Sequence, residues 1–176
     1  MKKATLYDVW QLCQSAQGQI NRIYLHWTAA RYGQQFDDYH FNVDADGSIY
    51  QTCSSLTERK SHTWHRNTGA IGIALCCAYK ATAYADGNVD FGAYPPTVAM
   101  LDSTAQLVAI ICNGLQLSTS SVLTHAEIAD VDNYGPSTTF ERWDLWRLVD
   151  PADNVLKDGG RVLRGLVEWY RPRLKF

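Results

Sequence analysis

The chain has 176 residues, of which 46% are hydrophobic and 19% are charged, so we expect one globular domain spanning residues 1–176 with a buried core. Its formal net charge of −2 excludes a protein that mainly binds the phosphates of nucleic acids. Uninterrupted apolar stretches stay shorter than the roughly 18 residues of a membrane span, so the sequence predicts none.

The start of the chain and its cysteines bear on the cellular compartment. Met1-Lys2-Lys3 is followed by a mixed sequence and not by an apolar signal core, so we expect synthesis in the cytoplasm. The five cysteines are odd in number, and no pair has the spacing of a zinc knuckle or a redox motif. We interpret Cys76 and Cys77, neighbours in an apolar run, as small core residues in a reducing compartment.

Hydrophobic periodicity and turn residues predict the elements in chain order. They are a helix over 5–17, a strand ending at His26, a loop over 29–38, a hairpin of 39–43 and 48–51, a polar loop over 61–69, a buried strand over 70–77, a loop over 80–96, a helix over 97–115, a strand over 121–125, an irregular segment over 126–140 and a last helix over 162–170. Strands interleaved with helices, without regular βαβ repetition, predict an α/β fold with a central mixed sheet flanked by helices.

Two histidines occupy equivalent places in this pattern. His26 and His125 each end a short β-type run, so neighbouring strands could point both imidazoles into one site. A catalytic zinc ion typically takes three protein ligands and leaves a fourth position for water. We prefer Asp144 as the third ligand because it closes the loop that begins at His125, and Asp130 and Asp132 remain alternatives.

An ordered set of short motifs accompanies these residues. It comprises Tyr24-Leu25-His26-Trp27-Thr28, Tyr39-His40-Phe41, Asp46-Gly47, Ile49-Tyr50-Gln51, Thr63-Trp64-His65, Ile71-Gly72-Ile73, Thr124-His125 and Arg142-Trp143-Asp144. The set resembles the zinc-dependent N-acetylmuramoyl-L-alanine amidases, whose superfamily also contains the peptidoglycan recognition proteins. The resemblance covers roughly residues 21–148, and its C-terminal part is most similar to phage and prophage lysis amidases.

The resemblance implies roles for individual residues. It makes His26, His125 and Asp144 the ligands of a Zn²⁺ cofactor. Arg142 lies where family members often have a lysine that stabilises the transition state, and arginine keeps the charge but not the shape. Tyr39 lies where one branch has a tyrosine that helps to activate water. Another branch uses a glutamate as general base at the position of Ala74.

Other polar and aromatic residues have less specific interpretations. His65 could donate to the substrate or line the cleft. We expect His40 and His62 at the surface or behind the site. Trp27, Trp64 and Trp143 could form walls for sugar or stem peptide, although plain core tryptophans would look the same in sequence.

The resemblance implies an enzyme that binds peptidoglycan and hydrolyses the amide bond between N-acetylmuramic acid and L-alanine. We expect a monomer that acts on the cell wall or in the periplasm after release, as a phage-type endolysin does. An interbacterial toxin and a cytoplasmic recycling amidase remain open. Two alternatives change the class of the protein. It could be a non-catalytic peptidoglycan-binding module, or its zinc could be structural, although structural sites usually have four cysteine-rich ligands.

Overall fold

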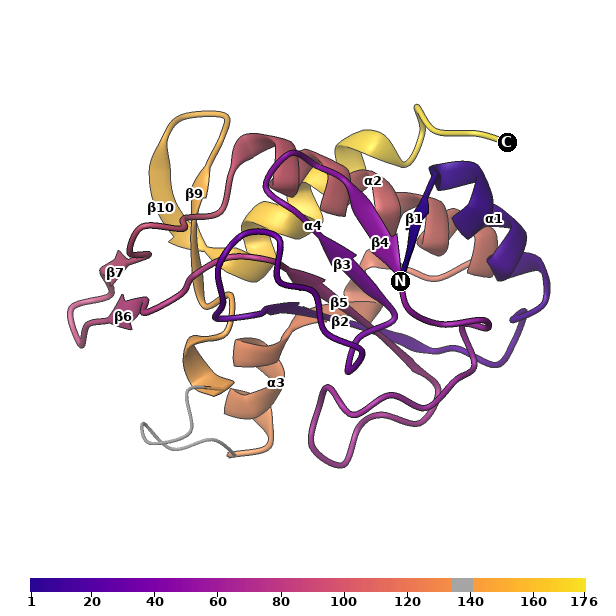
Figure 1. Cartoon of the computed structure of the whole chain (residues 1–176), viewed down its shortest axis with the longest axis horizontal. Coiled ribbons are helices and arrows are strands. Elements are labelled where there is room, and N and C mark those ends of the chain that lie inside the picture. The colour runs from indigo at the N-terminus through magenta and orange to yellow at the C-terminus, as the bar shows by residue number, and fades with distance from the viewer. Residues whose placement is uncertain (134–140) are drawn as a thin grey trace.

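A mixed β-sheet forms the centre of the protein in the computed structural model, which describes residues 1–133 and 141–176 (Figure 1). Its strand order is β1-β4-β3-β5-β2-β8. Strands β3, β5, β2 and β8 run parallel, whereas β4 pairs antiparallel with both β3 and β1. The strand bounds are β1 Lys2–Ala4, β2 Arg22–Trp27, β3 Phe41–Val43, β4 Ile49–Gln51, β5 Ala70–Leu75 and β8 Val122–Thr124.

Helices cover both faces of the sheet. Helices α1 (Leu6–Gln14), α2 (Val98–Leu115) and α4 (Gly159–Tyr170) lie on one side of β2 and β5, and α3 (His125–Val131) lies on the other (Figure 1). The α/β prediction with a mixed sheet flanked by helices is therefore confirmed.

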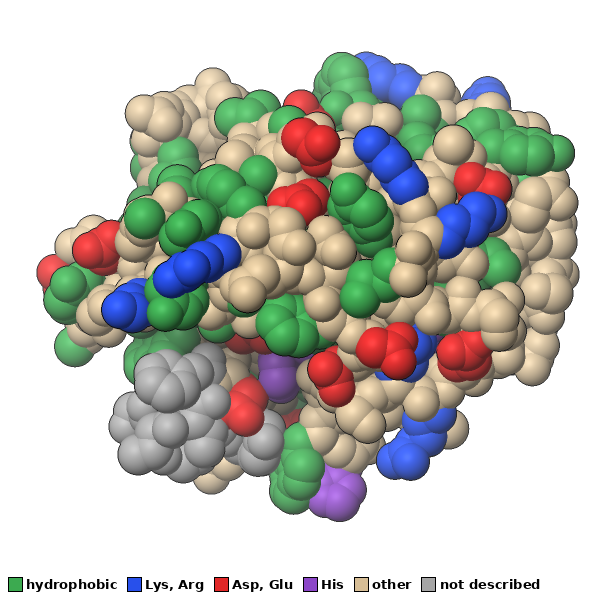
Figure 2. Space-filling model, viewed as in Figure 1, with side chains coloured by type: hydrophobic (Ala, Val, Ile, Leu, Met, Phe, Trp, Pro, Cys, Tyr) green, Lys and Arg blue, Asp and Glu red, His purple; other side chains and the backbone are tan. Residues whose placement is uncertain are grey.

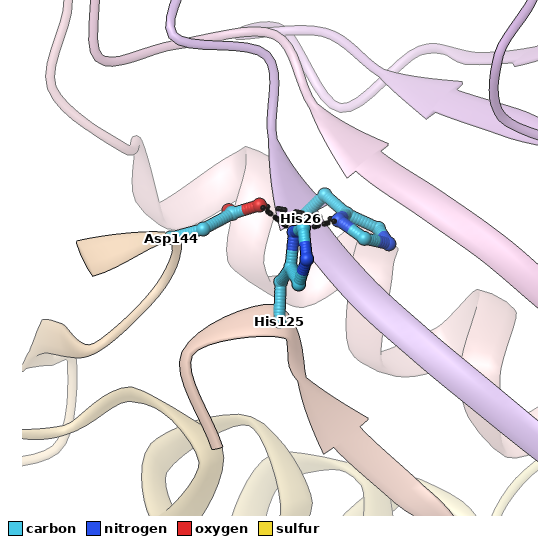
Figure 3. Close-up of side chains that lie close together, drawn as sticks. All are labelled: His26, His125 and Asp144. Carbon is cyan, nitrogen blue, oxygen red and sulfur yellow. Dashed lines mark hydrogen bonds and ion pairs between the residues drawn. The ribbon is translucent and has the colours of Figure 1, made fainter. Parts of the chain in front are cut away.

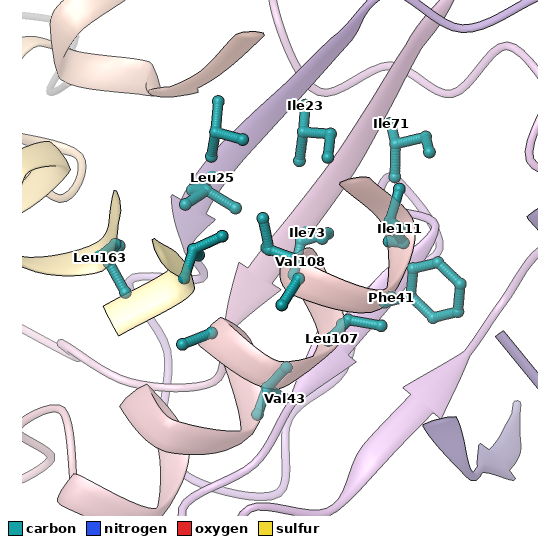
Figure 4. Close-up of a cluster of buried hydrophobic side chains, with 14 of the residues drawn as sticks. Ile23, Leu25, Phe41, Val43, Ile71, Ile73, Leu107, Val108, Ile111 and Leu163 are labelled. Carbon is teal, nitrogen blue, oxygen red and sulfur yellow. The ribbon is translucent and has the colours of Figure 1, made fainter. Parts of the chain in front are cut away.

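The two faces of β2 have different roles because successive side chains of a strand point to opposite sides. Ile23 and Leu25 point into the main core, where they meet α2 and α4 side chains such as Val108 and Leu163 (Figure 4). Tyr24 lies on the other face and packs with Ile128 of α3. The alternation places His26 on the face of Tyr24, away from the main core.

Helix α2 is long and apolar enough to cross a membrane by length and composition alone. Its mean hydropathy is 1.5, and 67% of it is buried inside the protein. Its N-cap Thr97 accepts a hydrogen bond from the Met100 backbone N–H, as the sequence predicted. A core helix passes the same length and composition test, and α2 packs against α1, α4 and the sheet.

Several predicted elements are confirmed and others need correction. The hairpin of β3 and β4 and the Thr5 cap of α1 are as predicted, although α1 ends at Gln14 and not Gln17. The last helix begins at Gly159, before the predicted start at Val162. The prediction missed β1, two short 3-10 helices and two small hairpins, namely β6 (Thr82–Ala83) with β7 (Val89–Asp90) and β9 (Arg147–Asp150) with β10 (Val155–Asp158).

The prediction of an irregular segment over residues 126–140 is wrong for its first part. Residues His125–Val131 form α3, and Thr124 caps it through a capping box with Glu127. This pairing of Thr124 and Glu127 is a helix-start signal that the sequence contained. Residues 134–140 lie outside the described part of the chain.

Candidate metal centre and active site

Three side chains meet at the end of β2, on the face opposite the main core (Figure 3). His26 Nδ1 lies 3.2 Å from His125 Nδ1 and 3.1 Å from Asp144 Oδ2. His125 Nδ1 lies 3.0 Å from the same Asp144 oxygen. All three residues are buried, with exposed fractions of 1%, 8% and 6%.

The sheet register brings the two histidines together. Leu25 of β2 and Thr124 of β8 are the last pair between these two strands. The residues that follow them, His26 and His125, therefore lie next to each other where β8 ends. Thr124 is also the N-cap of α3, which makes His125 the first residue of that helix. The side chain of His125, at the start of α3, therefore points toward His26 near the end of β2.

Asp144 is fixed by two backbone contacts. Its Oδ1 accepts a hydrogen bond of 2.5 Å from the Trp27 N–H, and its backbone carbonyl accepts one of 3.0 Å from the Ala126 N–H. The residue follows the 3-10 helix η2 (Glu141–Trp143). These contacts connect Asp144 to the residue after His26 and to the residue after His125.

Burial and hydrogen bonding set the charges of this group. Burial lowers the pKa of His26 because the imidazolium is poorly solvated there, although Asp144 opposes the shift. Burial would raise the pKa of Asp144, but hydrogen bonds with His125 and His26 outweigh it and hold the pKa below its ordinary value. The site therefore combines a neutral His26 with an ionised carboxylate.

This donor set fits a divalent metal ion. Zinc binds neutral imidazole nitrogens and carboxylate oxygens at about 2.0–2.2 Å, which places neighbouring ligand atoms of a tetrahedral centre roughly 3.3 Å apart. The spacings among His26, His125 and Asp144 are close to this value, and His, His and Asp form a group that could hold a metal. Three protein ligands would leave a further position open, as in catalytic zinc sites.

Residues 16–139 match the protein family of N-acetylmuramoyl-L-alanine amidases. The chain belongs to this family. The predicted membership is thereby confirmed, and the match spans His26 and His125 but ends before Asp144. No protein among those with curated descriptions matches the chain.

Solved structures of low identity are also similar to this amidase family member. A mutant endolysin from Bacillus subtilis is 22% identical, with 71% of this chain and 81% of that chain covered and a TM-score of 0.47. The endolysin N-acetylmuramoyl-L-alanine amidase LysCS from Clostridium intestinale is 20% identical, with 66% and 86% covered and a TM-score of 0.44. PGRP-SA from Apis mellifera is 19% identical, with 61% and 71% covered and a TM-score of 0.45.

Tyr39 lies beside the three-residue cluster. Its ring centre is 5.1 Å from that of His26. Burial, and then the charge of Asp144, raises the pKa of Tyr39, so its phenol keeps its proton at neutral pH. Ala74, at the place of the other branch's glutamate, pairs with His26 in the neighbouring strand β5 and is fully buried. Tyr39 is thus a proton-bearing group beside the site, whereas Ala74 offers no titratable side chain.

The guanidinium of Arg142 points to the end of α3. Its Nη2 donates a 2.8 Å hydrogen bond to Asn133 Oδ1, and its Nη1 lies 3.5 Å from Asp130. Its role in stabilising the transition state stays a prediction.

The alternative third ligands lie elsewhere. Asp132 accepts two hydrogen bonds from the guanidinium of Arg66, at 2.7 and 2.5 Å. The Asp130 side chain is 81% exposed. Of the three aspartates that the sequence left open, Asp144 is the one that joins the two histidines.

The predicted substrate-binding residues take different positions. Trp64 is 52% exposed and lines a pocket of about 330 Å³ together with His125. His65 is exposed next to it, with ring centres 3.9 Å apart and a left-handed φ of 56°. Trp27 is 8% exposed and packs edge-on against Phe91 in the core, as the core alternative predicted. Their contact with substrate stays a prediction.

Histidines also lie behind the site. The ring of His62 is 5.4 Å from that of His26 and is 6% exposed, while His40 is fully buried, so the surface interpretation of both is wrong. The Gly72 N–H donates to His40 Nδ1 at 3.1 Å, and His40 Nε2 bonds the Glu58 carbonyl at 2.8 Å. His40 is therefore a structural residue of the sheet. In Figure 2, histidine atoms are visible in the lower part of the molecule near acidic side chains.

The sequence analysis assigned no separate role to two residues that lie next to the site, Thr63 and Gly72. Thr63, 4% exposed, lies between His26 and His62. A Cβ on Gly72 would lie 2.5 Å from the His62 ring, so only glycine leaves room for that ring on the sheet. The Gly72 signal was present as a glycine inside a buried strand, which often marks a close approach.

Proposed function

We propose that the protein is a zinc-dependent N-acetylmuramoyl-L-alanine amidase that hydrolyses the bond between N-acetylmuramic acid and L-alanine in peptidoglycan. The observation that carries the proposal is the buried group of His26, His125 and Asp144 in a chain of this amidase family. In this proposal Zn²⁺ is the cofactor and these three residues are its ligands.

Amide hydrolysis needs a strong nucleophile and stabilisation of the oxyanion. Zinc, when bound, lowers the pKa of water toward about 7 and polarises the amide carbonyl. The protonated Tyr39 hydroxyl would donate a hydrogen bond that orients the water or the developing oxyanion. Arg142 would offer positive charge to the tetrahedral intermediate.

The substrate would approach through the pocket that His125 and Trp64 share. An exposed aromatic ring beside the ligands offers a flat surface for a sugar or stem peptide. His65, next to Trp64, would donate to the substrate from the rim.

The setting is part of the same proposal. We infer a monomer that is made in the cytoplasm and acts on the wall or in the periplasm after release, as a phage-type endolysin. A wall-degrading toxin would need the same chemistry. A non-catalytic peptidoglycan-binding module would need the pocket but no reaction.

The test is incubation of the purified protein with peptidoglycan sacculi, with and without a chelator, followed by labelling of newly released amino groups. The proposal predicts new N-terminal L-alanine that disappears with chelator and returns when zinc is added. Binding to sacculi without this release would support the binding module instead. Arg142→Ala should keep zinc and lose most of the activity, and full activity in this variant would remove Arg142 from the mechanism.

A further inference from the structure

The hydroxyl of Thr63 bridges two buried histidines. Its Oγ1 lies 3.4 Å from His26 Nε2 and 2.9 Å from His62 Nδ1. His26 uses its other nitrogen, Nδ1, to face Asp144 and His125. The bridge therefore meets His26 on the side away from the ligand group.

The surrounding loop holds this hydroxyl in place. Asn67 Oδ1 accepts hydrogen bonds from the backbone N–H of Thr63, at 2.8 Å, and of His62, at 3.1 Å. The His62 ring lies over Gly72, where a side chain would collide with it. Both ends of the bridge are thus fixed by the loop and the sheet.

A metal bound at His26 Nδ1 fits a simple arrangement of protons in the three groups. A neutral imidazole carries one N–H, and a hydroxyl donates one hydrogen bond while it can accept another. If His26 Nδ1 is a metal ligand, its proton lies on Nε2 and is donated to Thr63 Oγ1. The Thr63 hydroxyl can then donate its own proton to His62 Nδ1.

We propose that Thr63 is a positioning residue that, with His62, fixes the ring orientation and the tautomer of His26 for metal binding. The inference rests on the proposed zinc site and extends it to side chains that do not touch the metal. Partners of this kind, which bind the second nitrogen of a ligand histidine, typically change metal affinity by about 10–100-fold when removed.

The test compares Thr63→Val, which removes the hydroxyl at nearly constant volume, with Thr63→Ser, which keeps it. Thr68→Val, on the same loop and exposed, is the matched control. For each protein we would measure the zinc dissociation constant by chelator competition, the visible spectrum of the cobalt-substituted form and the melting temperature without metal.

We expect Thr63→Val to bind zinc about 10–100-fold more weakly with an altered cobalt spectrum, while Thr63→Ser and Thr68→Val stay close to the wild type. Wild-type affinity and spectrum in folded Thr63→Val would overturn the inference but leave the zinc site intact. Equal loss in Thr63→Val and Thr63→Ser would also overturn it, because the hydroxyl would then not be the cause. Absence of zinc binding by the wild type would overturn the proposed function as well.

Discussion

Asp144 Oδ1 accepts a hydrogen bond of 2.5 Å from the backbone N–H of Trp27, the residue that follows His26. The end of β2 thus supplies one proposed ligand, His26, through its side chain and orients another, Asp144, through its main chain. The second oxygen of Asp144 is left facing both histidines. One oxygen of Asp144 thus accepts the backbone hydrogen bond and the other faces the histidines. A substitution that keeps the hydrogen bond but removes the charge can therefore test the two roles separately.

Asp144→Asn should weaken zinc binding by at least about tenfold. The amide oxygen can still accept the Trp27 N–H, but the negative charge that attracts the metal is lost. Zinc content after dialysis checks this, and Asp132→Asn is the control because Asp132 binds Arg66 instead. Zinc retained in Asp144→Asn and lost in Asp132→Asn would show that the wrong aspartate has been chosen.

Tyr39→Phe should reduce amidase activity by about 100-fold and leave zinc affinity unchanged. The substitution removes the phenolic proton donor beside His26 and keeps the ring that packs there. Initial rates on sacculi and zinc titration measure the two effects. Tyr7→Phe, at a residue that is 56% exposed, should behave like the wild type. Full activity of Tyr39→Phe would assign activation of water to another group.

Gly160→Ala should lower the free energy of unfolding by about 1–3 kcal/mol. A Cβ at Gly160 would collide with the Glu127 carboxylate. That carboxylate cannot easily move, because it accepts hydrogen bonds from the Arg164 guanidinium at 2.7 and 2.8 Å and from the Thr124 backbone N–H at 2.9 Å.

Gly165→Ala is the matched control in the same helix, where a Cβ would meet nothing within 4 Å. We expect it to stabilise the protein by up to about 1 kcal/mol, because alanine favours the helix. Urea unfolding of both variants measures the difference. Equal stability of the two variants would show that Glu127 is free to move aside.

The metal-free protein should lose stability as the pH falls from about 6.5 toward 4. Burial lowers the pKa of His40 from 6.5 to about 4, so in this range the unfolded chain binds a proton that the folded chain does not. Each such histidine contributes a slope of up to about 1.4 kcal/mol per pH unit. Burial also lowers the pKa of His62, to about 2, which acts in the same direction.

Urea unfolding at several pH values with chelator present measures this slope. His40→Gln removes one titrating group while its amide can still accept from Gly72 and donate to Glu58, so its slope should be shallower. The same slope in both proteins would show that His40 does not carry the effect.

Local patterns in the sequence were sufficient for the main elements and for two members of the site. The strand that contains His26 and the helix capped by Thr97 are specified by residues close together in the sequence. Their hydrophobic periodicity therefore predicts them without knowledge of the fold. The prediction failed at α3, where the Thr124 and Glu127 capping box begins a helix at once after β8. Because β8 passes directly into α3, no turn residues separate the two elements and mark the start of the helix.

The sequence by itself determined the α/β class, the family resemblance and the two histidines of the site, although His125 begins α3 and was predicted to end a strand. The sequence preferred Asp144 but left Asp130 and Asp132 open, and the tertiary structure decided among the three because only their contacts show which one joins the histidines. Asp144 meets both histidines through Oδ2 while the Trp27 N–H binds its Oδ1, whereas Asp132 is held by Arg66. Thr63 and His62 also needed the fold, since the loop before β5 reaches His26 only when β2 and β5 pair in register.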